Sequence, residues 1–319
     1  MSRILITGAS GFIGTNLLEY LIGKGHEVIN IDCKEPKIAE RRSVWRDINI
    51  TDRQGTIDTI VGFDPEYIVH LAARTDLFGT CMKDYDANVT GVRNVLEAAE
   101  QCHNLKKILI TSSMLVCHAG YMPKNQRDYC PTNWYGKSKV ETENIVWSNK
   151  PKCDWAILRP TSIWGAWFDE PYRKFFDMVR RRLYFHIGHT SCTKTYGYIE
   201  NTVYQIEQIM LNDTLDEGNK VFYLGDTPAI YIEEWANQIA DELGHSRPFR
   251  IPLWLIWPIA KVGDILKNKL HIFFPLTTFR IRNMSTDNIL DLTNTYAIAP
   301  NPPVNRIEGI RKTLKWMER

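Results

Sequence analysis

Two side chains at helical spacing could together move a proton. Tyr135 and Lys139 stand four residues apart in the segment YGKSK, so on a helix both project from one face. A free phenol has a pKa of about 10, which is too high for a base at neutral pH. Because a nearby ammonium group favours the phenolate, the pair predicts proton exchange with a hydroxyl or carbonyl group, with Tyr135 as the acid or base.

A second polar cluster, Thr111-Ser112-Ser113, closes the strand predicted at 107–111. Open parallel sheets bind their ligands at this carboxyl edge, so Ser113 is a candidate partner for the reacting oxygen. Taken singly, a YxxxK segment is usually a surface pair, and serines after a strand usually form a turn. Their joint occurrence, downstream of a glycine turn, indicates a site.

That glycine turn spans residues 6–14 (ITGASGFIG), between a predicted strand and a predicted helix. In this context Gly8 permits a tight turn, Gly11 lets the backbone approach a pyrophosphate, and Gly14 lets the helix pack closely. The start of the helix then supplies unpaired N–H donors. The spacing predicts a dinucleotide site.

Asp32 ends the next predicted strand, eighteen residues after Gly14. A carboxylate here accepts hydrogen bonds from the adenosine ribose hydroxyls and repels a 2′-phosphate, so the sequence favours NAD over NADP. Lys34 and the Arg41-Arg42 pair are close enough in sequence to weaken that preference.

Asp47 and Ile48 follow a short strand-like stretch at 44–46. The carboxylate and the apolar side chain could together border the adenine ring. A helix N-cap or a turn explains the aspartate equally simply.

The elements that must position these groups alternate regularly. Strands are predicted at 3–7, 27–31, 67–70, 107–111 and 155–159, and helices at 12–22, at 84–100 and from about 133. This order predicts an α/β fold, a Rossmann-type doubly wound parallel sheet over residues 1–166. A smaller mixed α/β substrate-binding region follows at 167–319, and the segment at about 200–226 is a candidate to return to the first domain.

Composition fits an ordinary globular enzyme, with 44% hydrophobic and 24% charged residues among 319. The formal net charge of +2 provides no field that would gather nucleic acid. Seven cysteines without a CxxC pair indicate reduced thiols rather than disulfides or a zinc site. A strand pattern begins at Arg3 and leaves no room for a signal peptide, so we expect a cytoplasmic enzyme without a metal.

Two surface features have alternative interpretations. The basic run Arg180-Arg181-Arg182 is better explained as a solvated helix face than as a binding patch. The apolar stretch at 251–260 falls well short of the roughly 20 residues that span a bilayer. Its Trp254 and Trp257 fit a helix docked on the core, which we favour, or a peripheral membrane contact.

Several motifs together resemble the extended short-chain dehydrogenases/reductases, within the NAD-dependent epimerase/dehydratase family and most similar to nucleotide-sugar epimerases. They are TGASGFIG at 7–14, HLAA at 70–73, NVTG at 88–91, the serine pair, YGKSK at 135–139, LRP at 158–160, YIEN at 198–201 and YLG at 223–225. The match is dense in the first half and thin beyond it.

The resemblance implies a role for each matching residue. Tyr135 would be the catalytic acid or base, Lys139 would bind the nicotinamide ribose and lower the tyrosine pKa, and Ser113 would hold the substrate oxygen. The cofactor would be bound by Gly8, Ser10, Gly11, Phe12, Ile13, Gly14, Asp32, Asp47, Ile48, Leu71, Ala72, Ala73, Asn88, Thr111, Tyr135, Lys139, Pro160 and Ser162.

Departures from the family narrow the chemistry. Sugar 4,6-dehydratases carry an Asp-Glu pair where this chain has Met114 and Leu115, so dehydration is disfavoured. Nucleotide-sugar decarboxylases usually have a glutamate at the Leu115 position, and sugar 3,5-epimerase-reductases have a cysteine there, so neither class fits this chain. Cys117 replaces the family's usual tyrosine, and we expect it to pack rather than react.

An NAD-dependent nucleotide-sugar epimerase is therefore the favoured function. A nucleotide-sugar reductase or dehydrogenase is the main alternative, and a hydroxysteroid or lipid alcohol dehydrogenase or an inactive nucleotide-binding protein are minor ones. By resemblance Lys194 would bind the diphosphate, with Arg280 and Arg282 as further candidates. The resemblance also implies a homodimer formed through the helices at 84–100 and 133–148.

Overall fold

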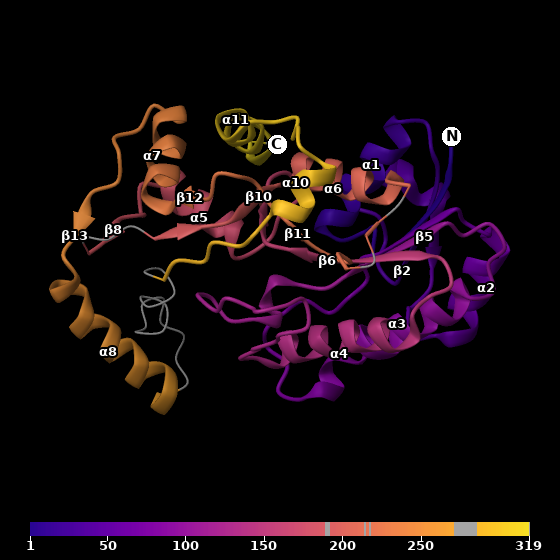
Figure 1. Ribbon diagram of the computed structural model, residues 1–319. Helices are drawn as coiled ribbons and strands as arrows, with labels where there is room; N and C mark the ends of the chain where they lie inside the picture. The colour runs from indigo at the N-terminus through magenta and orange to yellow at the C-terminus, as the bar shows by residue number, and fades with distance from the viewer. Residues whose placement is uncertain (189–191, 214, 217, 271–285, 319) are drawn as a thin grey trace.

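Seven parallel strands form one sheet in the order β3-β2-β1-β4-β5-β6-β11 (Figure 1). The computed structural model describes residues 1–188, 192–213, 215–216, 218–270 and 286–318, with side chains in α8 described as far as residue 263. The strands are β1 (Arg3–Thr7), β2 (Glu27–Asp32), β3 (Trp45–Asp47), β4 (Tyr67–His70), β5 (Lys107–Thr111), β6 (Asp154–Pro160) and β11 (Val221–Leu224). The Rossmann-type prediction is confirmed. The edge strands are β3, which overlaps the strand-like stretch noted at 44–46, and β11, which the sequence pattern did not identify as a strand.

Helices cover both faces of the sheet, which is why its strands are almost continuously apolar. Successive residues of β1 face opposite ways: Ile4 and Ile6 belong to the core beneath α1 and α6, whereas Leu5 belongs to the core beneath α2, α3 and α4. Figure 1 shows these two helical layers above and below the sheet. The helices are α1 (Phe12–Gly23), α2 (Arg53–Phe63), α3 (Asp86–Ala99), α4 (Trp134–Asn149) and α6 (Ile199–Leu211).

The second region is built on short strand pairs and an aromatic cluster. Trp164 and Trp235 lie with ring centroids 5.3 Å apart, and Phe176 stacks on Trp164 at 5.6 Å. These rings belong to the same buried cluster as Ile4, so the two regions share one core. The elements are β7 (Ser162–Trp164) with β10 (Tyr196–Tyr198), β9 (Thr193–Lys194) with β12 (Ile230–Tyr231), β8 (His186–Ile187) with β13 (Arg250–Ile251), α5 (Tyr172–Arg180), α7 (Ile232–Glu242), α10 (Thr293–Ile298) and α11 (Arg306–Met317).

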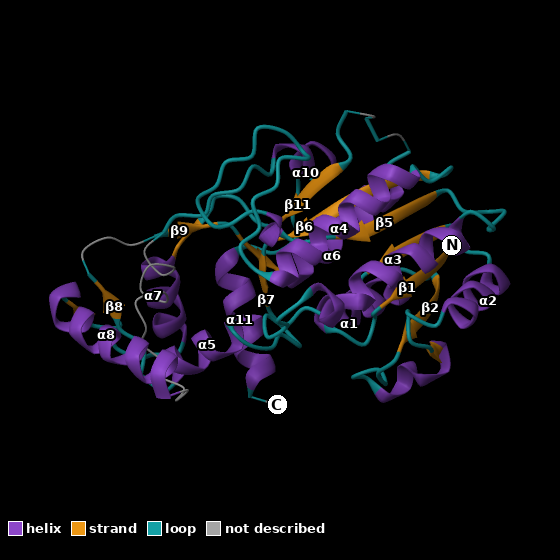
Figure 2. Cartoon of the chain, turned by 90° about the horizontal axis from the view of Figure 1, so that it is seen from below, coloured by secondary structure: helices purple, strands orange, loops and turns teal. Residues whose placement is uncertain are grey.

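Helix α8 (Leu253–Leu270) follows β13 at the end of the molecule farthest from α2 (Figure 2). Over the part of the chain that the structure describes, no helix combines the length and the apolar character needed to cross a membrane.

Candidate functional site

The glycine turn joins β1 to α1 at the carboxyl edge of the sheet. Gly8 has φ +80°, and a Cβ there would lie 2.6 Å from the backbone nitrogen of Ala72. A Cβ on Gly14 would lie 2.3 Å from the Gly8 carbonyl oxygen, so both positions exclude any side chain. Gly11 is the N-cap of α1 and offers no side-chain cap, which leaves the first N–H groups of the helix for a ligand.

Asp32 lies against this turn. Its carboxylate accepts hydrogen bonds from the backbone N–H of Ser10 at 3.1 Å and of Lys34 at 2.9 Å. Burial raises the pKa of Asp32, and the two hydrogen bonds act against that rise. The carboxylate is therefore fixed beside the glycine turn, where we predict that the adenosine ribose binds.

Asp47 ends β3 directly across from Asp32 in the parallel pairing of β2 with β3. Its explanation as a helix N-cap is wrong, because the following helix α2 is capped by Asp52, whose side chain accepts from the backbone N–H of Gly55. Asp47 is exposed and Ile48 is half-buried. Both remain available to border a ligand at this edge.

Helix α4 delivers the tyrosine and the lysine. Its N-cap, Asn133, accepts a hydrogen bond from the backbone N–H of Gly136 at 2.7 Å. A Cβ on Gly136 would lie 2.3 Å from the carbonyl oxygen of Leu115, so the glycine lets α4 approach the segment after β5. This approach brings Tyr135 next to Ser113, and both side chains are only 8% exposed.

The same burial sets the protonation of the pair. It raises the pKa of Tyr135 to about 12, and the adjacent Ser113 hydroxyl opposes that rise. Burial lowers the pKa of Lys139 to about 8, and the Glu143 carboxylate opposes that fall. The Lys139 ammonium donates to the carbonyl oxygen of Thr111 at 2.8 Å, which holds it at the end of β5. Near neutral pH the lysine is thus charged.

A buried ion pair lies behind these groups, and sequence reasoning did not assign it a role. Glu143 and Arg159 are 0% and 1% exposed and join through two hydrogen bonds of 2.8 and 2.7 Å. The Glu143 carboxylate also accepts from the hydroxyls of Ser112 at 2.5 Å and Tyr129 at 2.8 Å. Glu143 follows Lys139 by four residues, so the sequence predicts that both side chains lie on the same face of the helix.

The segment after β4 packs against the turn from the other side. The Ala72 N–H donates to the Thr7 hydroxyl at 3.2 Å, and Leu71 and Ala73 flank it. The Thr7 hydroxyl also pairs with the buried His70 ring at 2.7 Å. Burial, together with the Lys139 charge, lowers the pKa of His70 to about 3, so this ring stays neutral.

Asn88 connects two segments that border the site. Its side-chain amide donates to the Arg74 carbonyl at 3.0 Å and to the Ser138 hydroxyl at 2.9 Å, and its oxygen accepts from the Arg74 N–H. It therefore ties the segment after β4 to α4. At the other end, Pro160 closes β6, and Ser162 accepts a hydrogen bond from Tyr172 at 2.6 Å.

The remaining predicted residues fall into three groups. Lys194 lies in β9 and is half-buried, which lowers its pKa. Arg280 and Arg282 lie outside the described residues. Cys117 is buried, its thiol approaches the Asp128 carbonyl at 3.4 Å, and burial raises its pKa, all of which suits a packing residue.

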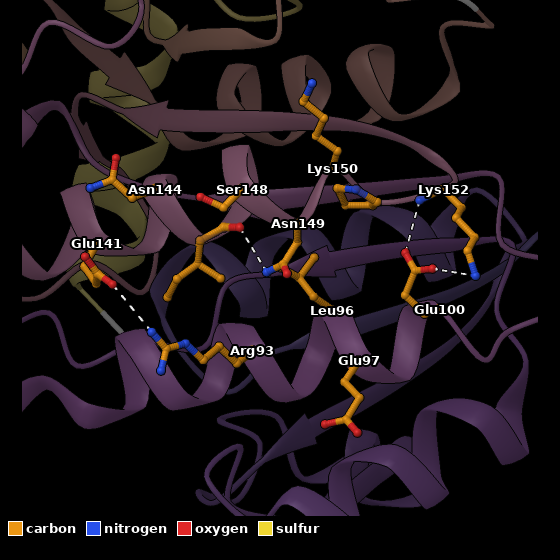
Figure 3. Close-up of a pocket in the computed structure, with 12 residues that line it drawn as sticks. Arg93, Leu96, Glu97, Glu100, Glu141, Asn144, Ser148, Asn149, Lys150 and Lys152 are labelled. Carbon is orange, nitrogen blue, oxygen red and sulfur yellow. Dashed lines mark hydrogen bonds and ion pairs between the residues drawn. The ribbon is translucent and has the colours of Figure 1, made fainter.

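A groove on the outer surface of α3 and α4 is distinct from this site (Figure 3). Polar and charged side chains line it, and Arg93 pairs with Glu141 across it at 3.5 Å. None of the predicted catalytic or cofactor-binding residues lines it. The groove lies on the two helices through which we predict a dimer.

Known proteins resemble this chain over most of its length. The model of the NAD dependent epimerase/dehydratase family matches residues 4–216. The chain belongs to this family. An N-acetyl-α-D-glucosaminyl-diphospho-ditrans,octacis-undecaprenol 4-epimerase of Escherichia coli O157:H7 is 27% identical, with 98% of this chain and 95% of that protein aligned. Membership confirms the expected enzyme class and the resemblance to the extended short-chain dehydrogenases/reductases.

Two further relatives show the breadth of the family. A 3-β-hydroxysteroid dehydrogenase of Mycolicibacterium neoaurum is 25% identical, over 78% of this chain and 72% of that protein. The UDP-glucose 4-epimerase of Thermus thermophilus, solved in complex with NAD, superimposes with a TM-score of 0.72 at 20% identity, covering 99% of each chain. The likeness to that structure establishes the shared fold.

Proposed function

We propose that the protein is an NAD-dependent epimerase that inverts one carbinol carbon of a sugar carried on a diphosphate. The observation that carries this proposal is the buried grouping of Ser113, Tyr135 and Lys139 at the carboxyl edge of the sheet, next to the glycine turn. The Escherichia coli relative, aligned over nearly the whole chain, is by name a 4-epimerase of a diphosphate-linked sugar. The UDP-glucose 4-epimerase with the same fold supports the same reaction class.

The residues present fit the proposed cofactor. The cradle at Gly8, Gly11 and Gly14 has no room for side chains and presents the start of α1 to a pyrophosphate. Asp32 would accept from the ribose hydroxyls, which favours NAD over NADP. The Thr111 hydroxyl is buried and has no hydrogen-bond partner among the described residues, as expected of a group that completes its bonding with a ligand. When bound, NAD would accept a hydride from the sugar and later return it.

The chain itself handles the proton. Tyr135 would take the proton of a ring hydroxyl as the carbon is oxidised and return it when the ketone is reduced from the other face. Ser113 would donate to the reacting oxygen and restrict its position. The charged Lys139 would stabilise the phenolate, countering the burial that raises the phenol pKa.

The surroundings of Ser113 limit the reaction to this exchange. Met114 and Leu115 follow it, and neither can act as an acid or a base. The amide of Asn288 approaches the Met114 sulfur at 3.8 Å, which places the 286–290 segment beside the site. Lys194 pairs with the same segment through the bridge to Asn288 and is the described cation that we assign to the diphosphate.

The proposal can be tested with purified protein. The bound nucleotide is released by denaturation and identified by mass, and the protein is then incubated with UDP-, GDP-, dTDP- and CDP-sugars and with a polyprenyl-diphosphate sugar in detergent. We expect retained NAD and an isomeric product without net change in cofactor absorbance. Consumption of substrate with stoichiometric change in that absorbance would instead establish a reductase or dehydrogenase.

Matched variants link the activity to the site. Tyr135→Phe and Lys139→Met are expected to lose turnover by about two to four orders of magnitude. Lys137→Met is the control, because Lys137 lies on the same helix, is exposed and stacks on Trp134 at 4.2 Å. Near-normal turnover of Tyr135→Phe would refute the assignment.

A further inference from the structure

Helix α8 has two apolar faces, of which only one is covered. Ile256 and Ala260 are 2% and 0% exposed and pack with Phe185, Ile187 and Ile251, the residues in and beside the β8–β13 pair. This contact anchors the helix to the substrate-binding region. It accounts for the spacing of four residues between the two buried side chains.

The opposite face is apolar and open. Its large side chains keep between 45% and 73% of their area exposed, and they are Trp254, Leu255, Ile259 and Val262. Trp254 also lines a shallow apolar depression with Pro252, Leu253, Trp257 and Pro258. A row of exposed tryptophan, leucine, isoleucine and valine on one helix is unusual for a surface in water and marks an interaction surface.

The helix is positively charged as well as apolar. Its sequence contains Lys261, Lys267 and Lys269 against Asp264 alone, a net charge of +2 that equals the formal charge of the whole chain. The exposed Arg181 and Arg182 come shortly before β8, on which α8 packs. Within the described part of the chain, the ion pairs near this helix include Lys174 and Arg180 but not Arg181, Arg182 or Lys261.

The helix lies in the second region. Figures 1 and 2 show α8 at the end of that region, away from the half in which we propose the cofactor. Farther along the chain, Asn288 contacts Met114 next to the proposed catalytic serine. A partner bound to α8 would therefore lie at the region that we predict to bind the sugar.

We propose that α8 is an interfacial helix that docks this enzyme on an anionic lipid bilayer, with Trp254, Leu255, Ile259 and Val262 inserted and Lys261 at the headgroups. An open apolar face with tryptophan and leucine and a basic margin is the combination that binds anionic membranes. The docking rests on these residues alone. The consequence for the substrate, a sugar diphosphate carried on a membrane lipid, rests on the proposed function.

The charge argues against a second copy of this chain as the occupant. A twofold dimer through this face would place α8 against its own symmetry mate. Two helices of net charge +2 would then meet, and like charges at close range oppose association. An anionic surface matches the same charge.

Vesicle flotation tests the docking with the full-length protein. We expect binding to vesicles of phosphatidylcholine with phosphatidylglycerol, and at least about tenfold weaker binding to phosphatidylcholine alone or in high salt. The double variant Trp254→Glu/Leu255→Glu is expected to lose binding by about tenfold or more. Leu211→Glu is the matched control, because Leu211 is an exposed leucine at the end of α6.

Further measurements keep the test decisive. The single variant Lys261→Glu leaves the apolar face intact and is expected to weaken binding to anionic vesicles severalfold. Epimerisation of a water-soluble UDP-sugar reports on folding and on the proposed function independently of lipid binding. The α8 variants should leave the rate of this reaction unchanged. Wild-type protein that floats but epimerises neither the nucleotide-sugars nor the polyprenyl-diphosphate sugar would refute the function and retain the docking.

Three results would overturn the docking. Wild-type protein that remains unbound at every lipid composition would do so. A larger assembly in light scattering that falls to a smaller one in Trp254→Glu/Leu255→Glu would assign the face to a second copy. Equal binding by that variant and the wild type would show that another surface contacts the lipid.

Discussion

Replacing Glu143 by glutamine should weaken the whole fold and shift the pH dependence of activity. The carboxylate is fully buried, accepts four hydrogen bonds and neutralises the buried Arg159. Glutamine keeps the size and part of the hydrogen bonding but removes the charge. Breaking one partner of a buried ion pair costs about 3–5 kcal/mol, because the other charge stays buried without compensation.

That cost is measurable by thermal unfolding. At about 2 °C per kcal/mol for a domain of this size, Glu143→Gln should lower the Tm by roughly 6–10 °C. Glu141→Gln, two residues earlier on the same helix, is the control. Its pair with Arg93 is 3.5 Å long and exposed, so the change should cost at most about 1 kcal/mol.

A second readout separates the effect on the site from the effect on stability. Glu143 supports the protonated form of Lys139, whose pKa of about 8 should fall when the carboxylate is lost. The loss of activity on raising the pH should then begin at lower pH than in the wild type. A Tm equal to that of Glu141→Gln, together with an unshifted pH profile, would refute the assigned role of Glu143.

Five further predictions concern the pH dependence, the cofactor site and the assembly. In the wild type, activity should fall as the pH rises through about 8, because Lys139 loses the proton that makes it a cation; a profile that stays flat to pH 10 would contradict this. Folding stability should change in the opposite sense. Because the pKa of Lys139 is lower in the folded protein than in the unfolded chain, the unfolded chain binds more protons above pH 8. The contribution of Lys139 to the free energy of unfolding therefore grows as the pH rises from 8 and is lost as the pH falls through 8. Asp32→Ala should erase the preference for NAD over NADP in equilibrium binding, and an unchanged preference would remove the basis for the cofactor assignment. Gly14→Ala should abolish cofactor retention, since the added methyl would lie 2.3 Å from the Gly8 oxygen; full retention would refute the cradle. Light scattering should give the mass of two chains, and a single-chain mass would refute the predicted homodimer.

The sequence patterns predicted the parts of the fold that rest on local regularity. Strand β5 is buried throughout, and its apolar run KILIT is typical of a strand covered on both sides. Strand β11 contributes only Val221–Leu224 after an irregular stretch, and its place beside β6 depends on pairing that no local pattern reveals. Strand β3 has only three residues, and the sequence indicated it as a strand-like stretch at 44–46 without its place beside β2.

The candidate site shows a similar division. The glycine turn, Asp32 and the Tyr135–Lys139 spacing could be identified because each has a fixed sequence distance. The Glu143–Arg159 pair could not, because its partners come from a helix and a strand and their joint burial is a tertiary property. Helix α8 divides likewise: its apolar run was evident, whereas the exposure of Trp254 became visible only once the packing of Ile256 and Ala260 was known.

Strand β11 and helix α6 come late in the sequence, although both belong to the first domain's sheet and its covering layer, and this affects folding during synthesis. Strand β6 has β11 as its outer neighbour, and α6 shares with α1 the task of covering one face. When only the first 166 residues have emerged from the ribosome, the nascent chain therefore has an unpaired strand edge and an incompletely covered apolar sheet face, both of which favour aggregation. The nascent half-protein must persist in that state for about sixty further residues, the interval in which a holding chaperone would have most effect.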